Sequence, residues 1–233
     1  MVKAALRQRM KGLLAQLSAK DIETRSAALT EQLLGLPCMQ QAEGVSCFLS
    51  MPSGEVRTDL LLRHLLPPAL AAKTKLTTVH ADSAVVLQKR LFVPKITGKA
   101  PQDMQMLEVK SLACLDSYTK NRWGIPEPPP SSAAAGDATS AGLIDVVLVP
   151  GVVFDSTCSR LGHGKGYYDS FLSRLTAARL DRGRARCIAV GLCFDEQVLE
   201  GAEVVPLEAH DVALDLVVTP TRVLVRPGGG GGA

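Results

Sequence analysis

The pattern of apolar and polar positions is clearest in the second half of the chain. Three short runs there are almost wholly apolar and rich in β-branched residues: IDVVLVP at 144–150, CIAVGLC at 187–193 and DLVVT at 215–219. Such runs are typical of strands buried on both faces of a parallel sheet. Between the first two, YYDSFLSRLTAARL at 167–180 has apolar residues on one side of a helix. The order strand, loop, helix, strand predicts an open α/β sheet.

The first half of the chain predicts helices and strands in alternation. Apolar residues recur at helical spacing over 1–17, and a second helix is predicted after Ser18, because SAKD has the form of an N-terminal capping box. A further helix over 58–66 is predicted to end at Pro67 and Pro68. Strands are predicted at VSCFL (45–49), RLFVPKI (90–96) and MLEV (106–109).

Together these patterns predict one α/β domain over residues 1–225. Its sheet is expected to be open and mainly parallel, flanked by helices, with the N-terminal helices packed on it. Residues 127–142, EPPPSSAAAGDATSAG, have almost nothing to bury and predict a mobile surface insertion. The tail 226–233, RPGGGGGA, predicts a disordered end.

Composition narrows the classes of function. The chain has 233 residues, of which 46% are apolar and 21% charged, and its net charge of +3 comes without a dense basic tract. This argues against a general nucleic-acid binder. No apolar run approaches the roughly 20 residues of a membrane span. The six cysteines contain no CxxC pair, so reduced thiols in a cytosolic protein are expected rather than a disulfide framework or a zinc site.

The N-terminus allows two interpretations. It is rich in Lys and Arg, and no acid precedes Asp21, as in a mitochondrial transit peptide or in the first helix of a folded domain. Transit peptides are rich in serine, and none occurs before Ser18. The sequence therefore favours a helix of the mature fold and a cytoplasmic location.

The strongest chemical signal is RLGHGKGYYD at 160–169, which follows the first of the three buried strands. In open α/β sheets, ligands bind beyond the carboxyl ends of the strands. Three glycines let backbone N–H groups approach an anion closely, and Arg160 and Lys165 add positive charge. The next helix would begin near Gly166 with the positive end of its dipole. These features predict a polyphosphate site.

The stretch fits neither standard phosphate motif. A P-loop needs Ser or Thr where Gly166 stands, and a dinucleotide fingerprint that starts at Gly162 needs glycine where Tyr167 stands. A tight strand-to-helix connection without a ligand is the alternative. Asp169 could ligate Mg²⁺ beside phosphates, with Asp211 as the best distant candidate for a second carboxylate. Otherwise Asp169 would only complement the helix dipole.

The segment PGVVFDSTCSRLGHGKGYYDSFL, residues 150–172, resembles the signature of the 5-formyltetrahydrofolate cyclo-ligase family, also called 5,10-methenyltetrahydrofolate synthetases. Four other segments resemble this family in the same order along nearly the whole chain: KAALR (3–7), FLSMPSGEVRT (48–58), NRWGIPEP (121–128) and VPLEAHDVALDLVVT (205–219). Several ordered motifs are more specific than the glycine loop alone.

The resemblance implies a single-domain enzyme that uses ATP and Mg²⁺ to cyclise 5-formyltetrahydrofolate to 5,10-methenyltetrahydrofolate, with release of ADP and phosphate. It implies that Asp169 and Asp211 hold Mg²⁺ and that Arg160 and Lys165 are catalytic. The implied ATP contacts are Lys3, Arg7, Arg160, Leu161, Gly162, His163, Gly164, Lys165, Gly166, Tyr167 and Tyr168. The implied folate contacts are Leu49, Glu55, Trp123, His163, Gly164, Lys165, Gly166 and Tyr167.

The implied reaction passes through a phosphorylated formyl group, which the folate N10 then attacks. Because Lys3 and Arg7 belong to the implied site, the resemblance also favours an uncleaved N-terminal helix, and a monomer is expected. Without a ligand role, Glu55 would be a solvated turn residue and Trp123 part of the core. Two other functions stay open: a non-catalytic binder of reduced folate or nucleotide, and a sugar-phosphate isomerase or CoA transferase on a similar sheet.

Overall fold

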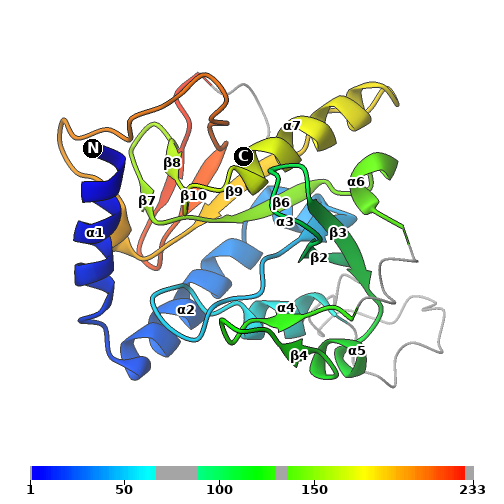
Figure 1. Ribbon diagram of the computed structural model, residues 1–233, viewed down its shortest axis with the longest axis horizontal. Helices are drawn as coiled ribbons and strands as arrows, with labels where there is room; N and C mark the ends of the chain where they lie inside the picture. The colour runs from blue at the N-terminus through cyan, green and yellow to red at the C-terminus, as the bar shows by residue number, and fades with distance from the viewer. Residues whose placement is uncertain (1, 67–88, 130–135, 229–233) are drawn as a thin grey trace.

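The computed structural model, which describes residues 2–66, 89–129 and 136–228, is built on a seven-stranded sheet (Figure 1). Its strands are β1 (Gly44–Ser46), β2 (Arg90–Ile96), β3 (Met104–Val109), β6 (Val146–Pro150), β9 (Ile188–Leu192), β10 (Leu216–Val218) and β11 (Val223–Val225). Their order across the sheet is β11-β10-β9-β6-β1-β2-β3. The five inner strands are parallel, and β3 and β11 are antiparallel edges. The predicted mainly parallel α/β sheet is confirmed.

Helices cover both faces of this sheet, as the apolar strand runs require. One face packs against α2 (Ala19–Leu34), α3 (Pro37–Gln41) and α4 (Asp59–Leu65), and the other against α6 (Ala138–Ala141) and α7 (Tyr167–Leu180). Helix α1 (Val2–Leu14) joins the first layer through its contacts with residues 153–154 and 195–197. Alternate residues of β6 serve the two layers: Val146 and Leu148 face the first, and Val147 and Val149 the second. None of the described helices combines the length and apolar character needed to cross a membrane.

The predicted helix boundaries agree with local chemistry. The Ser18 hydroxyl accepts a hydrogen bond from the N–H of Asp21 (3.1 Å), and the Asp21 carboxylate accepts one from the N–H of Ser18 (3.2 Å), which completes the capping box of α2. Pro67 and Pro68, the expected end of α4, lie outside the described residues. The strand predicted over 45–49 ends at Ser46, although the N–H of Cys47 still donates a hydrogen bond to the carbonyl of Phe92 in β2 (2.9 Å).

The stretch 127–142 differs from the insertion that its composition predicts. Its first residue ends β5 (Pro126–Glu127), which pairs with β4 (Thr119–Lys120). Its last part forms α6, where Ala138 and Thr139 are buried. The Asp137 carboxylate accepts hydrogen bonds from the N–H groups of Thr139 and Met106, both at 3.0 Å. Two small side chains of α6 are thus buried, although the composition of this stretch predicted almost nothing to bury. Residues 130–135 lie outside the described part.

At the C-terminus, the described residues of the predicted disordered tail, 226–228, follow β11 directly. The N–H of Arg226 donates a hydrogen bond to the carbonyl of Asp215 (2.9 Å) and extends the edge pairing by one contact. Residues 229–233 lie outside the described part of the chain.

The strand order creates a topological switch point between β1 and β6. From β1 the chain proceeds outward to β2, whereas from β6 it proceeds in the opposite direction to β9 and β10. Loops diverge at such a point and leave a ligand crevice beyond the carboxyl ends of the strands. The two loops concerned are residues 47–58 after β1 and 151–166 after β6. Both contain residues that the sequence assigns to a site.

Candidate active site at the switch point

The loop after β6 begins with a hairpin that the sequence pattern did not predict. It consists of β7 (Val153–Phe154) and β8 (Arg160–Leu161). The carboxylate of Asp155 fixes its turn by accepting hydrogen bonds from the N–H groups of Thr157 (2.9 Å) and Ser159 (3.0 Å). The hairpin thereby delivers Arg160 to the base of the glycine-rich segment.

The glycine loop, residues 162–166, leads directly into α7. Gly164 and Gly166 have φ values of +89° and +67°, in the left-handed region that side chains disfavour. Gly166 is the N-cap of α7, and no side chain caps this end. The first-turn N–H groups are therefore available to an anion. Lys165 is exposed, and no ion pair among the described residues includes it.

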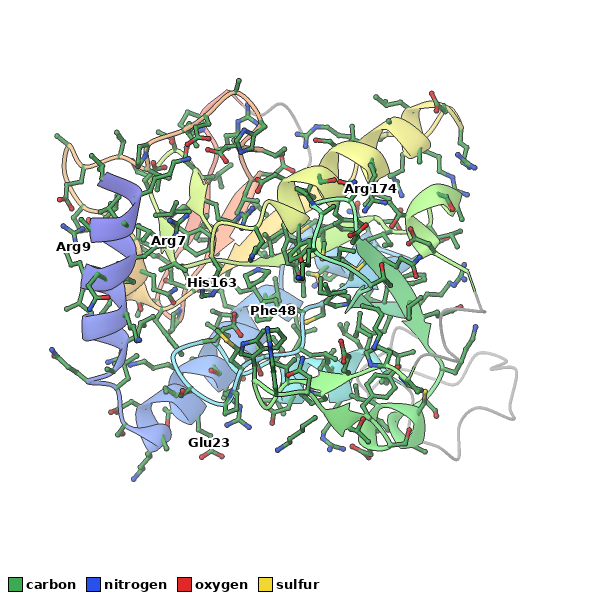
Figure 2. The ribbon with its side chains drawn as sticks, in the orientation of Figure 1. Arg7, Arg9, Glu23, Phe48, His163 and Arg174 are labelled. Atoms are coloured by element: carbon green, nitrogen blue, oxygen red, sulfur yellow. The ribbon has the colours of Figure 1, made fainter. Side chains whose placement is uncertain are left out.

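Helix α1 lies against the glycine loop and contributes one cation to it and a second to the neighbouring carboxylates. The Arg7 Nε donates a hydrogen bond to the carbonyl of Gly162 (2.8 Å). The Lys3 ammonium contacts the carboxylates of Asp211 (3.1 Å) and Glu208 (3.0 Å). Figure 2 shows Arg7 on α1 close to His163 of the loop. Partial desolvation, together with the charges of Arg7 and Arg160, lowers the pKa of His163.

A buried ion pair supports the loop from below. The Arg160 guanidinium donates from Nη2 to both carboxylate oxygens of Asp169, each at 3.0 Å, and from Nη1 to the carbonyl of Pro150 (3.3 Å). It also lies 5.9 Å from the centroid of the Tyr168 ring. The side chain of Arg160 is only 5% exposed and that of Asp169 14%. Arg160 thus holds the first turn of α7 in place and brings positive charge beneath the loop.

The two residues proposed for a metal lie in neighbouring segments, which one hydrogen bond joins. Asp169 Oδ1 accepts a hydrogen bond from the N–H of Val212 (3.2 Å), the residue that follows Asp211. Asp211 Oδ2 is engaged by Lys3 and by the N–H of Glu208 (2.7 Å), which leaves Oδ1 without a hydrogen bond among the described groups. No cluster of three His, Cys, Asp or Glu in the described chain could hold a metal alone. Mg²⁺ fits such a site, because it takes one or two carboxylates and completes its shell with phosphate oxygens and water.

The loop after β1 places Glu55 against the start of α7. The Glu55 carboxyl accepts a hydrogen bond from the N–H of Met51 (2.8 Å), and burial raises its pKa to about 7. Burial also raises the pKa of the Tyr168 hydroxyl, with further contributions from the neighbouring Cys47 and Glu55. Glu55 is therefore not a solvated turn residue, and Tyr168 connects it to the phosphate side of the crevice.

Trp123 stands on the surface beside this loop rather than in the core. It lies in the turn between β4 and β5, where Asn121 Oδ1 accepts a hydrogen bond from the backbone N–H of Trp123 (3.0 Å). Trp123 is 58% exposed, and the Arg122 guanidinium lies 4.0 Å from the centroid of its ring. A Cβ on Gly124 would lie 2.7 Å from Pro52, so the turn packs directly on the loop after β1.

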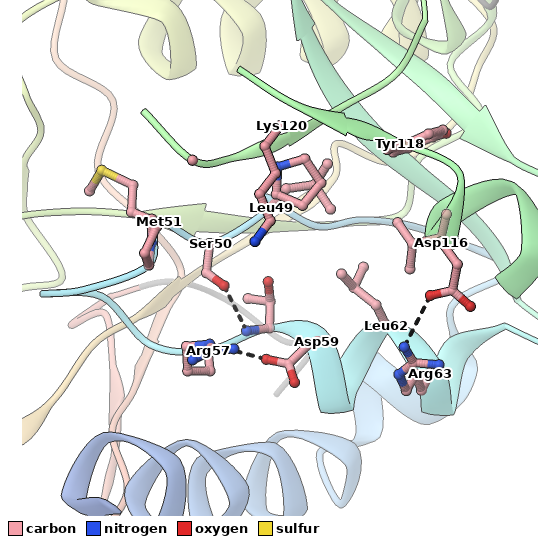
Figure 3. A pocket seen from close by; sticks show the side chains of 15 residues that line it. Leu49, Ser50, Met51, Arg57, Asp59, Leu62, Arg63, Asp116, Tyr118 and Lys120 are labelled. Carbon is pink, nitrogen blue, oxygen red and sulfur yellow. Dashed lines mark hydrogen bonds and ion pairs between the residues drawn. The ribbon is translucent and has the colours of Figure 1, made fainter. Parts of the chain in front are cut away.

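A pocket of about 430 Å³ opens between this loop and the β4–β5 hairpin (Figure 3). Leu49 lines it, and the glycine loop does not. Helix α5 (Leu112–Asp116) closes one end. The lining residues are Leu49, Ser50, Met51, Pro52, Arg57, Thr58, Asp59, Leu62, Arg63, Leu115, Asp116, Tyr118, Lys120, Gly124 and Pro126.

The structure thus gathers the predicted residues into two adjoining groups. The residues on the predicted phosphate side are Lys3, Arg7, the segment 160–169 and Asp211. The residues on the predicted folate side are Leu49, Glu55 and Trp123. Sequence reasoning missed Glu208, Tyr118 and Lys120. A carboxylate three residues before Asp211 and a cation three residues before Trp123 were the available signals.

Glu55 predicts a pH dependence of stability whose sign follows from its raised pKa. In the unfolded chain this carboxyl ionises near 4.5, whereas in the folded protein it keeps its proton up to about 7. Between these values the folded state binds more protons, so the free energy of unfolding falls as pH rises through this window. We expect Glu55→Gln to lack this contribution. Urea unfolding at several pH values from about 5 to 7.5 would show the wild type losing stability relative to the variant; a constant difference would contradict the prediction.

Comparison with known proteins gives one consistent result. The sequence model of the 5-formyltetrahydrofolate cyclo-ligase family matches residues 75–220. A probable 5-formyltetrahydrofolate cyclo-ligase of Schizosaccharomyces pombe is 33% identical over 223 residues, which cover 95% of this chain and 97% of that protein.

Two solved structures share the fold. The 5,10-methenyltetrahydrofolate synthetase of Aquifex aeolicus superposes with a TM-score of 0.66 at 26% identity, over 100% of this chain and 97% of that one. The synthetase of Mycoplasma pneumoniae gives a TM-score of 0.59 at 19% identity, over 94% of this chain and 99% of that one, and supports the fold alone.

Proposed function

The chain belongs to the 5-formyltetrahydrofolate cyclo-ligase family, and we propose that it converts 5-formyltetrahydrofolate and ATP into 5,10-methenyltetrahydrofolate, ADP and phosphate with the help of Mg²⁺. The observation that carries this proposal is the meeting of two loops at the switch point. Tyr168 lies between Arg160, under the glycine loop, and Glu55, in the loop after β1. A phosphate donor and a folate bound at these loops would therefore face each other.

On the phosphate side, the groups that would hold ATP are of three kinds. The N–H groups of the glycine loop and of the α7 N-terminus would contact phosphate oxygens. Lys165 would add a mobile cation, and Arg160 a fixed one. Lys3 and Arg7 would close the site from α1, where they already contact the loop and Asp211. Bound at Asp169 and Asp211, Mg²⁺ would neutralise charge on the phosphates.

On the folate side, Glu55 would accept hydrogen bonds from the N–H donor edge of the pterin, because one carboxylate can accept two such bonds at once. The exposed indole of Trp123 would cover the ligand, and Leu49 would form the apolar floor. His163 to Tyr167 would separate the two substrates.

The proposed chemistry starts with attack of the formyl oxygen on the γ-phosphorus, which breaks the bond to the β-phosphate oxygen and releases ADP. The folate N10 then attacks the activated formyl carbon and loses its proton to water. Phosphate leaves with the former formyl oxygen, and the ring closes. Phosphoryl transfer depends mostly on positioning and charge stabilisation, and the loop amides with Lys165 and Arg160 would provide both.

The proposal is tested with purified protein, 5-formyltetrahydrofolate and Mg²⁺, with and without ATP, by following the ultraviolet absorbance of the methenyl product. We expect product only with ATP, and formyl-¹⁸O should appear in inorganic phosphate. Folate binding without turnover would instead support the non-catalytic alternative. Formation of product without ATP, or release of the ¹⁸O label into water instead of phosphate, would contradict the phosphorylated intermediate.

The location and assembly of the protein are part of the same proposal. Because Lys3 and Arg7 contact the candidate site, we propose that α1 stays in the working enzyme. We also propose that the enzyme acts in the cytoplasm and that it is a monomer. A tagged full-length protein found only in mitochondria would contradict the cytoplasmic assignment, and size-exclusion chromatography with light scattering tests the monomer.

A further inference from the structure

We propose that the pocket between the loop after β1 and the β4–β5 hairpin binds the glutamate end of the folate, with Lys120 as the anchor for its carboxylates. This inference rests on the proposed function, which supplies the folate. A folate consists of a pterin, an aromatic p-aminobenzoyl linker and a terminal glutamate that carries two carboxylates. The pocket combines apolar side chains, which suit the linker, with cationic ones, which suit the carboxylates.

The pocket is continuous with the candidate folate site. Met51, whose N–H binds the Glu55 carboxyl, also lines the pocket, as does Leu49. Gly124, the residue after Trp123, lines the pocket too. A ligand with its pterin at Glu55 would therefore pass Met51 and Trp123 and enter the pocket.

The inner walls suit an aromatic linker. Side chains of Leu49, Leu62, Leu115, Tyr118 and Pro126 surround the space, and Leu49, Leu62 and Tyr118 are buried in the fold. Burial of an aromatic ring among such groups is favourable because it removes apolar surface from water. A volume of about 430 Å³ is large enough for a linker and part of its tail.

The lining carries more positive than negative charge. Its cations are Arg57, Arg63 and Lys120, and its acids are Asp59 and Asp116. Arg57 pairs with Asp59 (3.3 Å) and Arg63 with Asp116 (3.0 Å), but all four side chains are about half exposed. Ion pairs in such positions are weak and exchange easily.

Lys120 differs from the two arginines because no ion pair within the described ranges engages it. It is exposed at the end of β4, and Figure 3 shows its side chain reaching toward Leu49 and Ser50 across the pocket. An ammonium without an ion-pair partner among the described residues is suited to a carboxylate, since a charge-assisted hydrogen bond is stronger than a neutral one. Lys120 is therefore a specificity residue for the tail, away from the reacting atoms.

The test compares two ligands on variants of one residue. Lys120→Glu should raise KM for 5-formyltetrahydrofolate roughly tenfold or more, with kcat unchanged. It should leave KM unchanged for 5-formyltetrahydropteroate, which lacks the glutamate. Lys120→Gln should show the same pattern with a smaller shift. Lys20→Glu, an exposed lysine at the start of α2, is the matched control and should change neither value.

Binding provides a readout that does not depend on turnover. Trp123 is the single tryptophan of the chain, so its fluorescence reports folate binding directly. The Lys120→Glu variant should lose affinity for the glutamate ligand and keep it for the pteroate. Equal losses for both ligands, or no loss for either, overturn the tail site. The wild type could also bind both ligands, with Lys120→Glu weakening only the glutamate ligand, and yet form no product with ATP. In that case the proposed function fails while the tail site stands.

Discussion

Lys165→Ala is expected to lower kcat for the cyclisation by about 10²- to 10³-fold, the usual effect of removing one donor that stabilises developing charge. Lys165 stands between Gly164 and Gly166, both of which have positive φ values, and its side chain is exposed. It has no ion-pair partner among the described residues, so its charge is free to meet the transferring phosphoryl group. Because the side chain is exposed, its loss should leave the fold intact.

Three measurements separate this role from a structural one. The unfolding midpoint of Lys165→Ala should match that of the wild type. Lys165→Arg, which keeps the charge but changes its geometry, should recover part of the lost activity. Lys20→Ala should remain fully active. A folded Lys165→Ala enzyme with nearly normal kcat would remove Lys165 from the phosphate site.

Sequence patterns predicted the inner strands because their signal is local. β6 and β9 are buried on both faces, so every position is apolar, and the run itself is sufficient. The β7–β8 hairpin and β11 have only two or three residues each, and their pairing depends on partners elsewhere in the chain. No local pattern could have revealed them. In the same way, α6 is ordered by its contacts with α7 and β3 rather than by its composition.

The site shows the same division between local and distant information. The glycine loop could be recognised from ten adjacent residues, because glycines, cations and a helix start occur together. The proximity of Asp169 and Asp211 could not, since it depends on a hydrogen bond between segments 43 residues apart. Lys120 is an ordinary surface lysine in the sequence. It becomes a candidate only because the β4–β5 turn packs on Pro52 and closes a pocket.

Asp169→Ala is expected to reduce the free energy of unfolding by about 3–5 kcal/mol, because it leaves the buried guanidinium of Arg160 without its partner. The Arg160 side chain is 5% exposed and donates to both oxygens of Asp169. Asp211→Ala removes a different kind of contact. Its pair with Lys3 lies nearer the surface, so a cost of about 1 kcal/mol or less is expected. Urea unfolding at fixed pH measures both values.

Both variants should require more Mg²⁺ for half-maximal activity, although only one of them is strongly destabilised. This pattern separates the metal role of the two carboxylates from the structural role of Asp169. The double variant Arg160→Met with Asp169→Leu provides the control, because it removes the unpaired buried charge and should regain most of the stability without regaining activity. If the Mg²⁺ titration of Asp211→Ala matches the wild type, Asp211 is not a metal ligand. If Asp169→Ala unfolds like the wild type, the buried pair does not hold the first turn of α7 in place.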